Sequence, residues 1–189
     1  DRLVNHDGLT GLPTRQLLIE GLDSMIATCQ RHGSQAGLLL VDLDHFKAIN
    51  DSQGHAVGDL LLQQVARRLQ EVTVGVVMVA RMGGDEFAVL LDEQPEAAGV
   101  TKATSQKLLL AIGQPYSLAG QETRITACIG VVVFGGNGQN PEALLRQANI
   151  ALFHAKQEGR ESCRFHEPWM QASYVRGALL EADLRRALE

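Results

Sequence analysis

Cysteine is scarce in this chain of 189 residues, which contains only Cys29, Cys128 and Cys163. The three are odd in number, far apart and without a CxxC pair, so neither a disulfide framework nor a thiolate zinc site is predicted. The histidines show no HxxxH or HxH spacing, which argues against a histidine zinc site as well. We therefore expect a reducing, cytoplasmic setting.

Long hydrophobic runs and blocks of like charge are also missing. No apolar run reaches the roughly 18 residues of a membrane span, and the charged start DRLVNHDG is no signal peptide. We expect no membrane contact by this segment, and an anchor of a longer parent protein would lie elsewhere. The net charge of -5 and the pI near 5.7 argue against nucleic acid as a nonspecific electrostatic partner.

Two common nucleotide-binding motifs are absent. No GxxxxGK[ST] sequence occurs, which excludes P-loop chemistry. The stretch GGNGQN at 135–140 lacks the strand-to-helix glycine pattern of a dinucleotide fold. A nucleotide bound by this chain would therefore be held by local contacts and not by either of these motifs.

Hydrophobic periodicity predicts helices alternating with strands. Helices are expected over 15–33, around 59–69, over 95–112, over 140–159 and from about residue 174. Strands are expected over 37–44, in a hairpin around GGDE at 83–86, in a second hairpin of 116–118 with 123–133, and at an edge over 162–166. Asn140 is expected to cap the fourth helix, and Asp59 to lie in the first turn of the second. This order indicates an α+β sandwich, with helices flanking a mixed, largely antiparallel sheet.

The run GLLLVDLD at 37–44 is typical of a central strand covered on both faces. Burying an unpaired carboxylate there costs several kcal/mol, so Asp42 needs a cation or strong donors nearby. Mg²⁺ takes oxygen ligands, often one or two carboxylates with substrate phosphates. Asp42, the carbonyl of Leu43 and a carboxylate of the GGDE loop would make such a set if the hairpin lies beside this strand.

The sequence GGDE places two glycines and two carboxylates between apolar runs. Gly83 and Gly84 allow a tight turn and close approach to a ligand, while Asp85 and Glu86 supply charge. Alone, the stretch would be interpreted as a solvated hairpin tip, because turns favour Gly and Asp. Together with Asp42 in a buried strand, a ligand site is the favoured interpretation.

Five ordered segments resemble the GGDEF domain of diguanylate cyclases. They are DGLTGLPTR, VDLDHFKAINDSQGHAVGD, RMGGDEFAVLL, ITACIGVV and ANIALFHAKQEGR. The resemblance covers residues 1–165 and implies a ferredoxin-like α/β sandwich, similar to nucleotide cyclase and polymerase palm domains. Residues 166–189 resemble the linker helix toward an EAL phosphodiesterase domain, so we expect a piece of a tandem GGDEF-EAL protein.

The resemblance implies roles for eleven residues of this chain. The metal ligands would be Asp42, Asp85 and the Leu43 carbonyl, holding two Mg²⁺ ions per site, with Mn²⁺ as a substitute. Glu86 would help to deprotonate the attacking 3′-hydroxyl, and Asn50 and Asp59 would recognise guanine. The phosphate-binding groups would be the amides near His45 and Phe46, together with Lys47, Lys156 and Arg160.

The implied reaction joins two GTP molecules into cyclic di-GMP and releases pyrophosphate. Each domain would hold one GTP, so catalysis requires a homodimer whose two domains face each other. The alternative is a catalytically weak or silent GTP-binding domain that regulates a downstream EAL phosphodiesterase. Intact metal ligands and Glu86 favour the cyclase, whereas the tandem context favours the alternative. A different nucleotidyl cyclase or palm domain would lack Asn50, Asp59 and the GGDEF loop as a set.

The chain departs from the usual family pattern at Thr14, Cys128, Asn149 and Phe153, where Asn, Ser, Asp and Tyr are usual. Family members under product inhibition also carry an RxxD motif ending five residues before the signature. Here Val74 and Val77 occupy those positions. We therefore predict no inhibition by cyclic di-GMP through that site.

Overall fold

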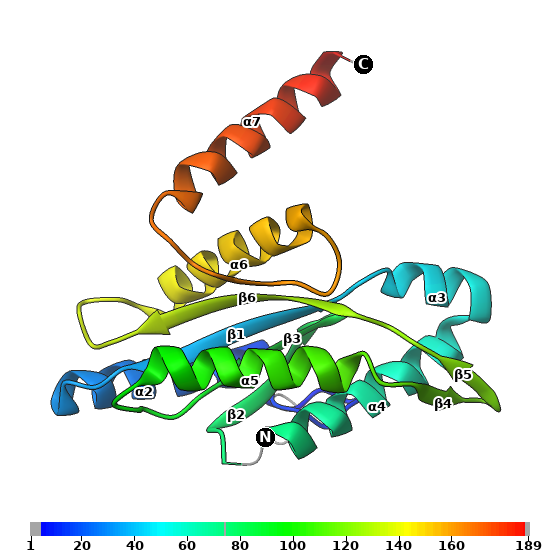
Figure 1. The fold of residues 1–189 in the computed structure, drawn as a ribbon, viewed down its shortest axis with the longest axis horizontal. Helices are drawn as coiled ribbons and strands as arrows, with labels where there is room; N and C mark the ends of the chain where they lie inside the picture. The colour runs from blue at the N-terminus through cyan, green and yellow to red at the C-terminus, as the bar shows by residue number, and fades with distance from the viewer. Residues whose placement is uncertain (1–4, 74, 188–189) are drawn as a thin grey trace.

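The computed structural model describes residues 5–73 and 75–187 and, at 178 and 180–187, the backbone alone. Its centre is a five-stranded sheet with the strand order β2-β3-β1-β6-β7 (Figure 1). The strands are β1 (Ala36–Leu43), β2 (Met78–Gly83), β3 (Glu86–Leu90), β6 (Ala127–Phe134) and β7 (Cys163–Phe165). Neighbouring strands are antiparallel except β6 and β7, which run parallel. The expected mixed, largely antiparallel sheet is confirmed.

Strand β1 lies in the middle of the sheet because its sequence is apolar on both faces. Every residue of the strand except Asp42 is buried. Alternate side chains point to opposite faces, so Leu38 and Leu40 join one core while Leu39 and Val41 join the other. The buried strand predicted over 37–44 is confirmed.

Helices cover both faces of the sheet. The helices α2 (Arg15–His32) and α6 (Pro141–Glu158) pack on one face, and α4 (His55–Val72) and α5 (Ala97–Ile112) on the other. Helix α6 comes very close to β6 at Gly130. A Cβ atom there would lie 2.2 Å from the Ala148 carbonyl oxygen and 2.4 Å from the Leu152 nitrogen. This close approach therefore requires glycine at position 130.

Helix α7 (Met170–Ala187) points away from the sheet beyond α6 (Figure 1). Met170 anchors it by packing with Ile150 and Ala151 of α6. The helix begins at Met170, earlier than the expected position near Tyr174, because this anchor orders its first turn. The predicted end at Glu189 lies outside the described residues. In the part of the chain that the structure describes, no helix is long and apolar enough to cross a membrane.

Local signals at helix ends are confirmed. Gly33 closes α2 in the left-handed region with φ 64°, and its N–H donates to the Cys29 carbonyl. The Asn140 side chain caps α6 by accepting a 2.8 Å hydrogen bond from the Ala143 amide, with Pro141 at the first helical position.

One helix was missed and two predictions were wrong. Helix α3 (Phe46–Gln53) was not predicted, because its two turns are polar and bury only Phe46. Helix α4 begins at His55, directly after Gly54 ends α3, so Asp59 lies in the second turn and not the first. The second hairpin is formed by β4 (Tyr116–Leu118) and β5 (Gln121–Thr123) alone. The chain then leaves this pair, and β6 begins at Ala127 beside β1.

Candidate active site

Asp42 lies one residue before the end of β1, between β3 and β6. The strand register sets it opposite Glu86 on one side and Cys128 on the other. Its side chain is 13% exposed, and Oδ2 lies 3.1 Å from the Nζ atom of Lys156. In the described structure Lys156 thus supplies a cation beside this nearly buried carboxylate.

The electrostatic balance around Asp42 is negative. Burial raises the pKa of Asp42, and the ammonium of Lys156 opposes that rise. The nearby carboxylates of Asp85 and Glu86 raise the pKa of Asp42 further. Among the charged groups that shift this pKa, one ammonium thus opposes two further carboxylates, which is an environment that favours additional positive charge.

The GGDE loop is held by Arg81, which precedes it on β2. Gly83 and Gly84 adopt φ angles of 131° and 52°, which glycine tolerates best. The Arg81 guanidinium donates to the Gly84 carbonyl from Nε at 3.2 Å and from Nη2 at 2.7 Å. It also donates from Nη1 to both carboxylate oxygens of Asp7 at 3.0 Å. The loop is thereby tied to the N-terminal turn.

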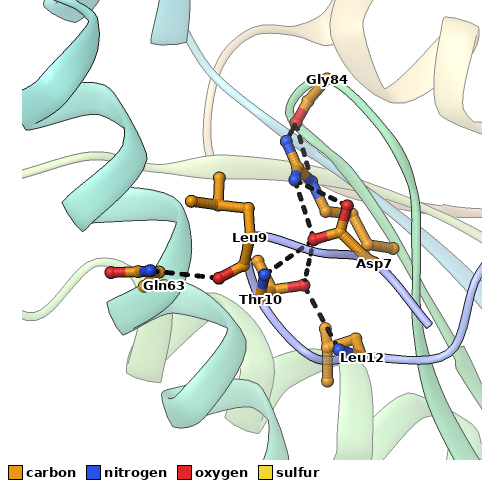
Figure 2. A network of polar contacts seen from close by, with 7 residues as sticks. Asp7, Leu9, Thr10, Leu12, Gln63 and Gly84 are labelled. Carbon is orange, nitrogen blue, oxygen red and sulfur yellow. Dashed lines mark hydrogen bonds and ion pairs between the residues drawn. The ribbon is translucent and has the colours of Figure 1, made fainter. Parts of the chain in front are cut away.

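Figure 2 shows this N-terminal network, in which Asp7, Thr10 and Gly84 lie close together. Asp7 also accepts hydrogen bonds from the Thr10 amide at 2.8 Å and from its hydroxyl at 2.6 Å. Burial alone would raise the pKa of Asp7, but the hydrogen bonds from Thr10 and Arg81 lower it below the usual value. Gln63 of α4 donates to the Leu9 carbonyl at 3.1 Å and so links the same turn to α4. Sequence reasoning missed these roles, although DGLTGLPTR was among the motif segments.

The N-terminus of α3 offers backbone donors beside the end of β1. The first N–H groups of a helix have no partner within it, and no side chain caps α3. His45 precedes the helix with φ 57°, in the left-handed region. Phe46 is buried in the core, so only its backbone can reach a ligand, while Lys47 is exposed.

Asn50 carries an unsatisfied buried acceptor. Its Oδ1 atom is buried without a hydrogen-bond partner, a rare and costly condition. A Cβ atom at Gly58 would lie 1.8 Å from that oxygen, so the glycine makes room for Asn50. Asp59, the residue after Gly58, is exposed.

The loop that follows α6 is held by Asp44. Asp44 accepts from the Thr126 hydroxyl at 2.6 Å, the Glu161 amide at 3.0 Å and the Cys128 thiol at 3.2 Å. Burial raises the pKa of Cys128, and Asp44 also raises it, so the thiol remains a donor at neutral pH. The sequence pattern predicted no role for Asp44.

Five of the predicted site residues surround one cavity of about 460 Å³. It is lined by Asp42, Leu43, Asp44, His45, Cys128, Lys156, Gly159 and Arg160. Glu86 instead lines a neighbouring cleft of about 410 Å³, which also includes Lys156, Arg15, Arg146, Phe153 and Tyr174. The remaining predicted residues line neither space: Phe46, Lys47, Asn50, Asp59 and Asp85.

The donor types at Asp42, Leu43 and Asp85 fit a hard cation, because carboxylate and carbonyl oxygens are the ligands that Mg²⁺ prefers. The Leu43 amide donates to the Asp85 carbonyl at 3.3 Å and joins the two segments, while the proposed ligand atom is the Leu43 carbonyl oxygen. Among the side chains that the structure describes, no three of His, Cys, Asp or Glu form a ready metal-binding cluster. The excess of carboxylates over cations nevertheless fits such an ion.

Comparisons with known proteins show the family of this chain. The family model described as "Diguanylate cyclase, GGDEF domain" matches residues 4–162. The chain is 41% identical over 188 residues to MucR of Pseudomonas aeruginosa, a bifunctional diguanylate cyclase/cyclic di-GMP phosphodiesterase, covering 100% of this chain and 27% of MucR. It is 35% identical over 188 residues to the cyclic di-GMP phosphodiesterase NbdA of the same organism, covering 99% of this chain and 24% of NbdA.

A solved structure supports the fold. The GGDEF domain of TpbB, also called YfiN, from Pseudomonas aeruginosa aligns with a TM-score of 0.85 and 33% identity, covering 90% of this chain and 99% of that one. The chain spans about a quarter of the length of MucR and NbdA. Its sandwich and its signature loop are those of one domain type, and the chain belongs to the GGDEF family of diguanylate cyclase domains.

Proposed function

We propose that this domain is a diguanylate cyclase that condenses two GTP molecules into cyclic di-GMP and pyrophosphate. The observation that carries the proposal is the cavity in which Asp42, beside Glu86 in the strand register, faces Lys156 and Arg160. Carboxylates next to cations across a cavity fit phosphoryl chemistry, in which metal ions and basic side chains neutralise the phosphates.

Two features support GTP as the substrate. The buried Oδ1 atom of Asn50 has no donor, and guanine offers N–H groups on its Watson–Crick edge. The exposed Asp59 follows Gly58, which packs against Asn50, so a second acceptor lies nearby. The uncapped amides of α3, with Lys47, Lys156 and Arg160, would hold the phosphates.

The residues Asp42, Asp85 and the Leu43 carbonyl would hold Mg²⁺ or Mn²⁺. When bound, the metal ions neutralise phosphate charge and make the attacking hydroxyl more acidic. Lys156 would then share its charge between Asp42 and the terminal phosphates, because its side chain is 45% exposed.

Glu86 is the proposed base. It would take the proton from the 3′-hydroxyl of one nucleotide, whose oxygen then forms a bond to the α-phosphorus of the other while pyrophosphate leaves. A positioned base contributes about 10²–10⁴-fold to such a step. Glu86 lines an open cleft beside the phosphate cavity, where a nucleotide carried by a second copy of this domain can approach. Two copies related by a two-fold axis would complete both bonds.

Mass spectrometry of the reaction products tests this proposal. GTP and Mg²⁺ are incubated with the chain at high concentration, with a dimer-forcing fusion, and with the fusion carrying Glu86→Gln. We expect cyclic di-GMP from the fusion and a loss of about 10²–10⁴-fold in the variant. Absence of product from both unaltered forms, at concentrations where they dimerise, would overturn the cyclase proposal.

A second candidate function is GTP-dependent regulation of an EAL phosphodiesterase in the same parent chain. The contact between Lys156 and Asp42 favours it, because the ammonium lies where a metal ion would bind. The similarity to NbdA favours it too. GTP binding without product would select this function.

We assign residues 1–165 to the nucleotide-binding domain, 166–189 to the linker helix, and the domain to the cytoplasm.

We also propose that cyclic di-GMP does not inhibit the domain through the segment before the signature. Val77 is 43% exposed and has no charge with which to bind a phosphate. Val74 lies outside the described residues. A titration of cyclic di-GMP against activity tests this, and inhibition abolished by changes at residues 74–77 would contradict it.

A further inference from the structure

Asp44 lies two residues after Asp42 and binds three donors from two other segments. The Thr126 hydroxyl and the Cys128 thiol come from the start of β6 and the residue before it. The Glu161 amide comes from the turn after α6. A carboxylate that accepts three hydrogen bonds is well satisfied by protein groups, which leaves it little capacity to bind a ligand.

The turn that Asp44 holds also carries Arg160. Gly159 has φ 129° and Glu161 has φ 56°, so Arg160 stands between two residues in unusual backbone conformations. Ser162 supports the same turn by donating to the Ala155 carbonyl at 2.5 Å. The conformation of this turn therefore decides where the Arg160 side chain starts.

Arg160 borders two spaces. One is the cavity of about 460 Å³ next to Asp42, and the other is a cavity of about 500 Å³ toward Ile49, Ser52 and Arg124. Asp44 lines both as well. A change in the turn would let the guanidinium point to the second space, away from Lys156.

We infer that Asp44 is a positioning residue: its hydrogen bond to the Glu161 amide directs Arg160 toward the terminal phosphates of a nucleotide bound beside Asp42. The inference rests on the proposed function, because it requires that Arg160 contacts those phosphates. It adds a role for a side chain that touches neither the nucleotide nor a metal ion.

Nucleotide titrations test the inference. Affinities for α,β-methylene GTP, which cannot release pyrophosphate, and for GMP are measured by calorimetry with Mg²⁺. The proteins are the unaltered chain, Asp44→Asn, Arg160→Ala and the double variant. We expect Arg160→Ala to weaken binding of the triphosphate by about tenfold and Asp44→Asn by about fivefold. The double variant should match Arg160→Ala within about twofold, because both changes remove one interaction.

GMP binding separates positioning from general damage. It should stay within about twofold in every variant, since GMP lacks the phosphates that Arg160 would contact. Equal weakening of both nucleotides by Asp44→Asn, or additive losses in the double variant, would overturn the inference. Asp23→Asn, on the exposed side of α2, is the matched control and should bind as the unaltered chain does.

Three further outcomes are distinct. If Asp44→Asn does not fold, Thr126→Val removes one donor to the same carboxylate, and triphosphate binding should weaken by about threefold with GMP unchanged; unchanged triphosphate binding in this variant would overturn the inference. If the unaltered chain binds the triphosphate no more tightly than GMP, the proposed phosphate site itself is wrong. If Arg160→Ala loses that preference and Asp44→Asn keeps it, only the positioning role fails.

Discussion

Asp42 and Asp44 lie two residues apart at the end of one strand, yet their surroundings differ. Asp42 faces one ammonium and two further carboxylates, so its site has negative charge in excess. Asp44 faces three donors without formal charge and is satisfied by them. The difference teaches that a carboxylate with unused binding capacity is available for a ligand, whereas a fully hydrogen-bonded one holds segments together.

The largest expected effect breaks the Asp42 half of this comparison. Asp42→Asn removes the charge that would bind the metal ion, and product formation should fall by about 10³-fold. The thermal unfolding midpoint should not fall, because the change removes the electrostatic repulsion between Asp42 and the carboxylates of Asp85 and Glu86. Product analysis with the dimer-forcing fusion and a thermal melt measure the two quantities. Retained activity would show that Asp42 has no role in the reaction.

Asp44→Ala tests the other half and should act on stability. It leaves the Thr126 hydroxyl and the Glu161 amide without their acceptor, and it removes one hydrogen bond from the Cys128 thiol, which also donates to the Gly159 carbonyl at 3.5 Å. At about 1 kcal/mol for each lost hydrogen bond, the free energy of unfolding should fall by about 3 kcal/mol. Urea denaturation measures it, with Asp23→Ala as the control. A loss below about 1 kcal/mol would contradict a structural role for Asp44.

Asp7 offers a third carboxylate that sharpens the comparison through pH. Its pKa is lowered in the folded chain, so the charged form stabilises the fold above the unfolded value of 3.8. That contribution is lost as the pH falls below 3.8 through the lower folded value. Asp7→Asn should cost about 1–2 kcal/mol at pH 7. The difference in the free energy of unfolding between this variant and the unaltered chain, measured by urea denaturation, should shrink below pH 3.8. A difference that stays constant would exclude the ionised carboxylate as the source of the stabilisation.

The smallest effect concerns the weakest donor to Asp44. Cys128→Ser keeps a donor at the same place and should change the free energy of unfolding by less than about 0.5 kcal/mol. Cys128→Ala removes the donor and should cost about 1–2 kcal/mol. The pair is compared by urea denaturation. Equal losses in the two variants would show that the thiol packs without a useful hydrogen bond.

Much of the fold was predictable from local pattern. The strand over 37–44, the hairpin around the signature and the Asn140 cap follow from apolar periodicity, glycine and capping chemistry, which act within a few residues. Helix α3 was not predictable in this way, because its apolar face consists only of Phe46 and Ile49 and is too short to establish a helical period. Its order depends on Phe46 packing into the core.

The site was predictable by residue type more than by contact. The sequence marked Asp42 as a carboxylate that needs a cation, but the partner Lys156 lies on a helix 114 positions away in the chain. The pair of Asp7 and Arg81 is separated by 74 positions. Such contacts depend on how the layers pack, and no local pattern encodes that packing.

The glycine at position 130 sets the reach of the site. Because β6 has no side chain there, α6 lies so close that its backbone at Ala148 and Leu152 would collide with a methyl group. Lys156 follows Leu152 by about one helical turn, so the position of α6 over the sheet determines where its ammonium lies relative to Asp42. The spacing between α6 and the sheet thus fixes the distance between Lys156 and Asp42. A substitution at this buried position would change that distance without altering any of the proposed ligand-binding residues.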